Sequence, residues 1–174
     1  RILSYLPLSH IAAQIMDVHV PLMTGSCVYF AQPDALKGSL VHSLNDVRPT
    51  IFFGVPRVWE KIAESMAAIG RATTGVKKML STYAKSLAAE KNKNAQYGGS
   101  NSTPFMYGCM KSLVLSKIKN AIGLDQCRSC FTAAAPISKE TLDYFASIDI
   151  PVYEVFGQSE CTGPHTITVA EQWI

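Results

Sequence analysis

The sequence predicts an α/β fold: a doubly wound, mostly parallel sheet flanked by helices, with an inserted helical arm over about residues 57–122. Short apolar runs rich in β-branched and aromatic residues alternate with stretches of helical periodicity, the order typical of parallel sheets. In the middle of the chain helical periodicity continues without strands, which predicts the arm. The 174 residues are 48% hydrophobic and 17% charged, so the chain has enough apolar material for a large core.

The first third of the chain is typical of a βαβαβ unit. The expected strands are Ile2–Leu6, Ser26–Ala31 and Thr50–Gly54, the second of them buried. Two helices separate these strands, and their expected caps are Ser9 and Asp34. The apolar face of the first helix is Ile11, Ile15, Met16 and Val20, and that of the second is Leu36, Leu40, Val41, Leu44 and Val47.

The arm is predicted to contain three helices, of which the first two are separated by Gly70 and the third spans Phe105–Ile122. The apolar positions of the first two helices are Val58, Ile62, Met66 and Ile69, then Val76, Met79, Leu80, Tyr83 and Leu87. Residues 92–104 are rich in Asn, Gly and Ser, so we expect a solvated loop there. A solvated face is also expected for the basic residues of the arm, which are opposed by Glu90: Arg71, Lys77, Lys78, Lys85, Lys91 and Lys93.

After the arm the alternation resumes with a strand over Arg128–Ala133, a helix capped by Ser138 and running to about Ser147, and a strand over Pro151–Phe156. In parallel sheets, ligands bind at the carboxyl ends of the strands. We therefore expect the loops that follow the strands to meet at one edge of the sheet. These loops are Pro7–His10, Gly54–Arg57, Ala133–Pro136 and Gly157–His165.

Charge and cysteine usage exclude some classes of protein. The net charge of +3 is far from that of a nucleic-acid-binding domain, and no apolar run reaches the ~18 residues of a membrane-spanning helix. Five scattered cysteines favour free thiols in a reducing compartment, so cytoplasm is expected. Cys127 and Cys130 lack a second pair for zinc and, in a strand, would point to opposite faces. Two buried or half-buried thiols are expected.

The loop after the last strand carries the most specific pattern. Gly157 and Gly163 bracket two hydroxyls and the carboxylate of Glu160, and small residues let a backbone approach a ligand closely. Beside a phosphate, a carboxylate is suited to bind Mg²⁺. An N-capping turn with a solvated Glu160 remains an equal alternative at this point. His10 also has two possible roles at this point: it could contact a substrate carboxylate, or it could satisfy the backbone of its own loop.

Two other function classes stay as alternatives. Gly157-Gln158-Ser159 begins like the nucleophile elbow of serine acyl hydrolases, in which Ser159 would be acylated. Cys161 stands where that motif has Gly, and Thr162-Gly163-Pro164 is a poor helix start, so the elbow is disfavoured. The other class is a non-catalytic module that docks on membranes through the basic arm.

Four segments, in order, resemble the motifs of adenylate-forming enzymes, and most closely those of the bubblegum-type long-chain acyl-CoA synthetases. They are Ser4–Ala12, Gly54–Ile62, Ala133–Pro136 and Val155–Glu160. The resemblance covers essentially the whole chain, and the ordered set is specific although each motif alone is weak. Ser159 before Glu160 and the continuation Gly163-Pro164-His165 favour the bubblegum subgroup.

The resemblance implies a fatty acid:CoA ligase. A long-chain fatty acid and ATP give an acyl-adenylate and pyrophosphate, and the thiol of coenzyme A then displaces AMP to give acyl-CoA. ATP, Mg²⁺ and coenzyme A are therefore the implied co-substrates and cofactor. The implied location is cytoplasmic, with peripheral contact to the endoplasmic reticulum or other membranes because the substrate is a lipid.

Roles for individual residues also follow from the resemblance. Glu160 matches the Mg²⁺-binding carboxylate, Ser159 a hydroxyl near the phosphate, and His10 a position beside the acyl carboxylate; these three are the implied catalytic residues. The nucleotide site is implied for Ala134, Ala135, Pro136, Phe156, Gly157, Gln158, Ser159, Glu160 and Cys161. The wall of the acyl tunnel is implied for Gly54, Val55 and Pro56. Phe156 replaces the more usual Tyr.

The sequence departs from the family pattern in what it lacks. The Gly/Ser/Thr-rich phosphate loop with its lysine does not occur in it, nor does the small C-terminal domain with its catalytic lysine. We therefore expect residues 1–174 to be part of the large N-terminal AMP-binding domain of a longer enzyme. We also expect the polypeptide alone not to catalyse adenylation.

Overall fold

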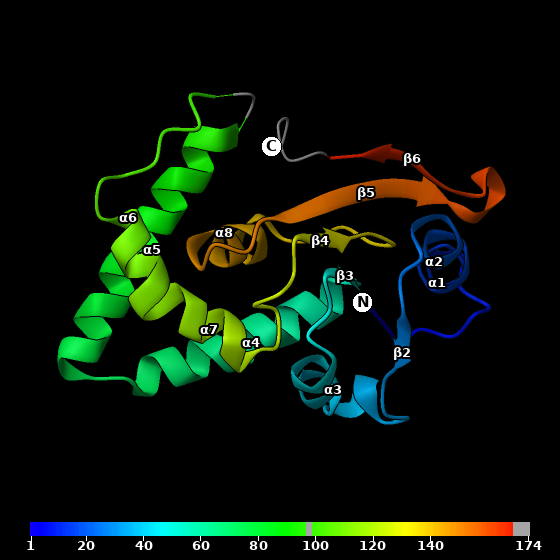
Figure 1. Ribbon diagram of the computed structural model, residues 1–174, viewed down its shortest axis with the longest axis horizontal. Helices are drawn as coiled ribbons and strands as arrows, with labels where there is room; N and C mark the ends of the chain where they lie inside the picture. Colours follow the sequence, from blue (N-terminus) through cyan, green and yellow to red (C-terminus); the bar gives the residue numbers. More distant parts are fainter. Residues whose placement is uncertain (97–98, 169–174) are drawn as a thin grey trace.

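The computed structural model describes residues 1–96 and 99–168, and its organising element is a six-stranded sheet with the order β2-β1-β3-β4-β5-β6 (Figure 1). The pairs β1–β2, β1–β3, β3–β4 and β4–β5 are parallel, whereas β6 runs antiparallel to β5. The strands are β1 (Ile2–Ser4), β2 (Val28–Phe30), β3 (Ile51–Gly54), β4 (Ser129–Thr132), β5 (Val152–Gln158) and β6 (Gly163–Ile167). The predicted mostly parallel sheet is confirmed.

The main core lies on one face of the sheet, beneath α3 (Leu40–Val47), the start of α4 (Pro56–Ala72) and α8 (Lys139–Ser147). Trp59 is fully buried there, and its ring meets those of Phe52 and Phe145 edge-on at centroid distances of 5.2 and 4.8 Å. The Trp59 indole N–H donates to the carbonyl oxygens of Gly54 and Phe131. Because buried indole N–H groups need an acceptor, these bonds fix α4 against β3 and β4.

The opposite face is covered near β1 by α1 (Ile11–Gln14), the π-helical segment η1 (Ile15–His19) and α2 (Val20–Thr24). The Ser4 hydroxyl donates to the Asp17 carboxylate at 2.6 Å, which joins β1 to η1. The β1-to-β2 connection thus lies on one face and the β2-to-β3 connection, through α3, on the other. This arrangement confirms the doubly wound fold.

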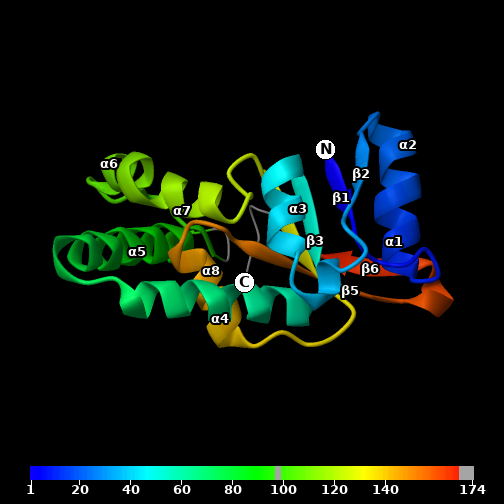
Figure 2. The same cartoon turned by 90° about the horizontal axis from the view of Figure 1, so that it is seen from below.

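The helical arm extends sideways from the sheet (Figures 1 and 2). It consists of the outer part of α4, then α5 (Gly75–Ala95), α6 (Tyr107–Met110), the π-helical η4 (Lys111–Leu115) and α7 (Ser116–Ala121). The arm has its own small core, formed by Ala84, Leu87, Ala88, Tyr107, Met110 and Leu115. The predicted arm is confirmed. Within residues 1–96 and 99–168, no helix combines the length and the apolar character needed to span a bilayer.

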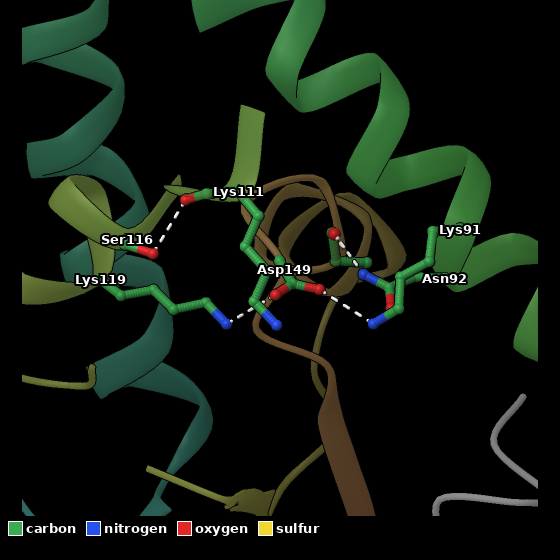
Figure 3. A network of polar contacts seen from close by, with 7 residues as sticks. Lys91, Asn92, Lys111, Ser116, Lys119 and Asp149 are labelled. Atoms are coloured by element: carbon green, nitrogen blue, oxygen red, sulfur yellow. Dashed lines mark hydrogen bonds and ion pairs between the residues drawn. The ribbon is translucent and has the colours of Figure 1, made fainter. Parts of the chain in front are cut away.

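A buried carboxylate ties the arm to the sheet (Figure 3). Asp149, between α8 and β5, is 4% exposed and accepts from Lys91 Nζ at 3.0 Å and from Lys119 Nζ at 2.8 Å. Beside it, the buried Asn92 amide donates to the Ala146 carbonyl oxygen at 2.7 Å. Burial raises the pKa of Asp149, but the two ammonium groups outweigh burial and leave that pKa lowered.

Several local predictions in the arm are wrong. α4 runs through Gly70 to Ala72, and the break falls at Thr73 and Thr74, whose extended backbones end one helix and precede the next. Asn92 lies in α5 rather than in a loop, because α5 continues in order to pack against α8. The basic residues are also not uniformly solvated, since Lys91 pairs with Asp149 and Lys85 lies over the Tyr144 ring at 5.0 Å.

Near the start of the chain, the predicted helix N-caps differ from those in the structure. His10, not Ser9, caps α1. Asp34 precedes a short 3₁₀ helix, η2 (Ala35–Lys37), and its carboxylate accepts from the Ser39 hydroxyl instead of capping. Helix α3 begins at Leu40, so Leu36 is outside its apolar face and exposed.

The second strand is exposed rather than buried. β2 is at the end of the strand order, where it pairs with β1 alone among the described strands, and Phe30 is 79% exposed.

The cysteine prediction is partly confirmed: Cys127 is half-buried, Cys130 is buried, and both are free. Their sulfur atoms nevertheless lie 3.5 Å apart, not on opposite faces. Cys127 precedes β4, so strand alternation does not apply to it.

Candidate functional site

The carboxyl ends of β1, β3, β4 and β5 meet at one edge of the sheet, where a cavity of about 620 Å³ opens. Its floor is the open face of the sheet, and its walls come from α1, η1 and the β5–β6 hairpin. Three of the four predicted loops contribute to it. The predicted site residues on its lining are His10, Ala134, Gly157, Gln158, Ser159 and Glu160.

His10 enters the cavity wall as the cap of α1. Its Nδ1 accepts from the Ala12 backbone N–H at 3.1 Å, so a neutral ring carries its proton on Nε2. The structure therefore satisfies the loop backbone with one ring nitrogen and leaves the other for a ligand. The two alternatives that the sequence left open for His10 are compatible.

Tyr5 holds two of the strand-end loops together, and the sequence did not single it out. Its hydroxyl donates to the Phe53 carbonyl oxygen at 3.1 Å and accepts from the Val55 N–H at 3.2 Å. Burial, only partly offset by the Val55 hydrogen bond, raises the pKa of Tyr5 to about 12. The phenol thus stays protonated and bridges the end of β1 to the end of β3.

The segment expected as a loop over residues 157–165 is mostly a hairpin. β5 extends through Gly157 and Gln158, the 3₁₀ helix η5 (Ser159–Cys161) makes the turn, and β6 pairs back with Gly157 opposite Pro164. A Cβ atom at Gly157 would collide with the Gly163 backbone, so glycine is required there by strand packing. A nucleophile elbow needs a strand–turn–helix; here a strand follows the turn, which removes the geometric basis for Ser159 as an acylated nucleophile.

Glu160 lies on the exposed turn η5 and belongs to the cavity lining. In the part of the chain described, no cluster of three or more His, Cys, Asp or Glu side chains could hold a metal ion. Mg²⁺ needs no such cluster when it arrives on a nucleotide, because phosphate oxygens and water supply most of its ligands and one or two carboxylates suffice. Glu160, with Ser159 beside it, fits that mode of binding.

Ala134 reaches the cavity in an unusual backbone conformation. Its φ is +78°, a region that L-residues other than Asn and Asp avoid, and Ala133 alone separates it from the end of β4. Strained positions of this kind cluster at functional sites. Ala135 and Pro136, which follow it, are exposed and are not on the cavity lining.

Five other predicted site residues are also away from the cavity. Gly54 is buried under the Trp59 indole and Pro56 begins α4 in the core, with Val55 between them. Phe156 points to the other face of β5, where its ring meets His165 edge-on at 5.3 Å. Cys161 is exposed, and its sulfur accepts from the Gln158 side-chain amide. Roles of these residues in binding remain predictions.

Sequence reasoning missed most of the apolar lining. Phe53, Phe131 and Val155 face the cavity from alternate positions of β3, β4 and β5. The period-two alternation of these strands was the available signal, but it does not say which face is covered. From the helices and the hairpin, the missed residues are Ile11, Ala12, Ile15, Met16, Val20, Gly163, Pro164 and Ile167.

Comparison with known sequences identifies relatives over nearly the whole chain. Residues 1–173 match the family model described as AMP-binding enzyme. The long-chain-fatty-acid–CoA ligase ACSBG2 of Xenopus laevis is 50% identical over 98% of this chain, and that of Homo sapiens is 47% identical over 96%. Human long-chain-fatty-acid–CoA ligase ACSBG1 is 43% identical over 94%. The chain spans 22 to 25% of the length of these curated relatives.

Solved structures with the same fold include adenylation domains of carboxylic acid reductases. An A-PCP didomain from Segniliparus rugosus, in complex with AMP, superposes with a TM-score of 0.59 at 20% identity, covering 95% of this chain and 19% of that one. The adenylation domain from Mycobacterium chelonae gives a TM-score of 0.53 at 18% identity, covering 91% and 20%. At these identities the likeness concerns the fold.

Proposed function

The chain belongs to the AMP-binding enzyme family, and from that membership we propose that it supplies part of the adenylate site of an ATP-dependent long-chain fatty acid:CoA ligase. The observation that supports this most is the cavity itself, which joins His10, Ala134 and residues 157–160 from three separated motifs. The names of the relatives, long-chain-fatty-acid–CoA ligases, support the same substrate class.

The reaction begins by activating a poor electrophile. A carboxylate oxygen of the fatty acid attacks the α-phosphate of ATP, pyrophosphate leaves, and an acyl-adenylate forms. The thiol of coenzyme A then attacks the acyl carbonyl and AMP leaves. Both steps depend mainly on positioning and on stabilising charge.

The described residues suit the first step. The apolar floor of Phe53, Phe131 and Val155 excludes water, while His10 keeps Nε2–H free to donate to the fatty acid carboxylate. The Glu160 carboxylate would hold the Mg²⁺ that accompanies the nucleotide, and the ion would supply neutralisation of phosphate charge there. Ser159 precedes Glu160 in η5. In this proposal its hydroxyl contacts the same phosphates.

The cellular setting is part of the proposal. All five cysteines are free thiols, which supports a reducing compartment and hence the cytoplasm. Because the proposed substrate is a lipid, we also propose peripheral association with membranes, including the endoplasmic reticulum. Coenzyme A as acceptor is supported by the names of the relatives.

The decisive experiment measures acyl-CoA formation from a long-chain fatty acid, ATP, Mg²⁺ and coenzyme A in the full-length protein. We expect Glu160→Ala to lower kcat/KM by ~100-fold, which corresponds to about 2.7 kcal/mol of lost charge stabilisation. Glu64→Ala, at an exposed position of α4, is the matched control and should retain activity. Full activity in Glu160→Ala would contradict its metal role.

The same assay separates the alternative enzyme class. Acyl ester hydrolysis that needs no ATP and disappears in Ser159→Ala would point to a serine hydrolase despite the hairpin geometry. Activity that requires ATP and releases pyrophosphate supports the ligase.

A further inference from the structure

The outer end of the arm exposes large apolar side chains on α4 and α5. The sequence pattern predicted a continuous apolar stripe on α5, and this stripe is buried only from its later turns onward, with Leu87 at 8% exposure. In the first two turns Val76 and Met79 are 68% and 66% exposed, and Leu80 and Tyr83 are also exposed. Ile69 of α4 adds a further exposed apolar side chain across the helix junction. We call residues 69–83 the arm tip.

Basic side chains are interleaved with these apolar groups. Arg71, Lys77 and Lys78 are all exposed at the arm tip. Between Glu64 and Asp125 the sequence holds nine basic residues and one acidic residue, Glu90, although the whole chain carries a net charge of only +3. The arm is therefore strongly cationic, and the opposing acidic charge lies elsewhere in the chain.

The arm tip also projects away from the candidate site. Figure 1 shows the α4–α5 junction at the lower left, at the opposite end of the molecule from α1 and the β5–β6 turn that border the cavity. Figure 2 shows the same junction at the outer end of the arm. A partner can therefore engage the arm tip without covering the cavity.

We infer that the arm tip docks on the surface of an anionic lipid membrane. A helix with apolar residues on one side and lysines beside them lies in the interface plane, with the apolar groups in the acyl boundary and the lysines at headgroups. Val76, Met79, Leu80 and Tyr83 have the i, i+3, i+4, i+7 spacing of one helix face; Lys77 borders this face, and Lys78 lies on the polar side of the helix. Nucleic acid would use the basic side chains but not this aliphatic stripe.

This inference rests on the proposed function in one respect, since it names the surface for the peripheral membrane contact proposed there, but it does not depend on the ligase reaction. Docking requires neither ATP nor Glu160, and it is measured without fatty acid or coenzyme A. A failed ligase assay would leave the docking result unaffected, and the reverse also holds.

The test is co-sedimentation of the full-length protein with vesicles of phosphatidylcholine alone and of phosphatidylcholine mixed with phosphatidylserine. We expect binding to the mixed vesicles that weakens as salt rises from about 0.1 M to about 1 M, because the Debye length falls from about 10 Å to about 3 Å. Lys77→Glu with Lys78→Glu should weaken binding by at least ~25-fold, since each basic residue near an anionic surface contributes about fivefold.

Matched controls separate the arm tip from general charge and apolar exposure. Lys37→Glu with Arg128→Glu changes the net charge equally at exposed positions outside the arm and should leave binding unchanged.

Val76→Ser with Met79→Ser should weaken binding by roughly tenfold through lost apolar burial. Leu22→Ser with Met23→Ser, at still more exposed positions on α2, should not weaken it. Equal effects of test and control variants would overturn the inference.

A second measurement asks what covers the arm tip in the full-length protein. In Met79→Cys, peptide-level thiol labelling should be fast in solution and slow once mixed-lipid vesicles are added. Protection without vesicles would show that another part of the longer chain occupies the tip and would overturn the inference. Salt-sensitive binding to RNA or to an acidic polypeptide in place of vesicles would overturn it equally.

Discussion

Ala134 combines a strained backbone conformation with a place in the candidate site. It lines the cavity with a φ of +78°, whereas Ala135 beside it has no such strain. The small side chain leaves room for a ligand, but alanine in this conformation is strained where glycine is not. The alanine-rich segment therefore stores strain at one defined position.

Substitution by glycine should reveal that strain. Ala134→Gly relieves roughly 1–2 kcal/mol of left-handed strain and loses roughly 0.5–1 kcal/mol to the greater freedom of glycine in the unfolded chain. We expect net stabilisation by about 0.5–1 kcal/mol, measured as the free energy of unfolding in urea. Ala135→Gly has only the second effect and should destabilise. Equal changes in the two variants would refute a special strain at Ala134.

At the scale of elements, the arm is an ordered part of the fold because a buried charge anchors it. Lys91 of α5 and Lys119 of α7 converge on Asp149, which has a φ of +61° at the turn after α8. The Tyr107 ring of α6 lies 5.4 Å from Lys91 Nζ. Helices α5 and α7 of the arm thus meet the end of α8 at a single carboxylate (Figure 3).

Removal of that charge should loosen the arm. Asp149→Asn keeps a residue that tolerates positive φ, so it isolates the electrostatic effect from backbone strain. We expect destabilisation by about 3 kcal/mol, the lower end for a broken buried pair, because both lysines can turn towards water. Urea denaturation measures the loss. Asp143→Asn breaks an exposed pair with Lys139 and should change stability by less than about 0.5 kcal/mol.

At the scale of the whole molecule, ion pairs join distant segments and make stability depend on pH. Arg48, at the end of α3, pairs with Asp125, in the chain before β4. The guanidinium lowers the pKa of Asp125 from 3.8 to about 2. The pKa of Asp149 is lowered as well. Asp17 acts in the opposite direction, since burial raises its pKa.

Acid should therefore weaken the fold. A carboxyl group with a lowered folded pKa contributes stability that is complete above its unfolded pKa and is lost as pH falls through its folded pKa. For Asp125 this window runs from 3.8 down to about 2. Urea midpoints should fall over this range, and Asp125→Asn should flatten the decline while lowering stability at neutral pH. An equally steep decline in the variant would assign the acid sensitivity to other groups.

The sequence alone determined the α/β class, the mostly parallel sheet, the arm and the Ser138 cap of α8. These features depend on local periodicity, turn residues and capping side chains, which are readable over a few residues. The rule for parallel strands likewise predicted that the loops carrying His10 and Glu160 meet at one edge of the sheet, and both residues line the cavity there.

Only the tertiary structure decided which apolar surfaces are covered. It turned the expected loop after β5 into a hairpin, directed Phe156 away from the cavity, and left the first turns of the α5 stripe exposed while burying Leu87. It also brought Asp149 together with Lys91 and Lys119 across 58 and 30 residues of sequence. The physical reason is that burial and charge pairing are set by contacts distant along the chain, whereas periodicity reports only that a helix or strand has an apolar side.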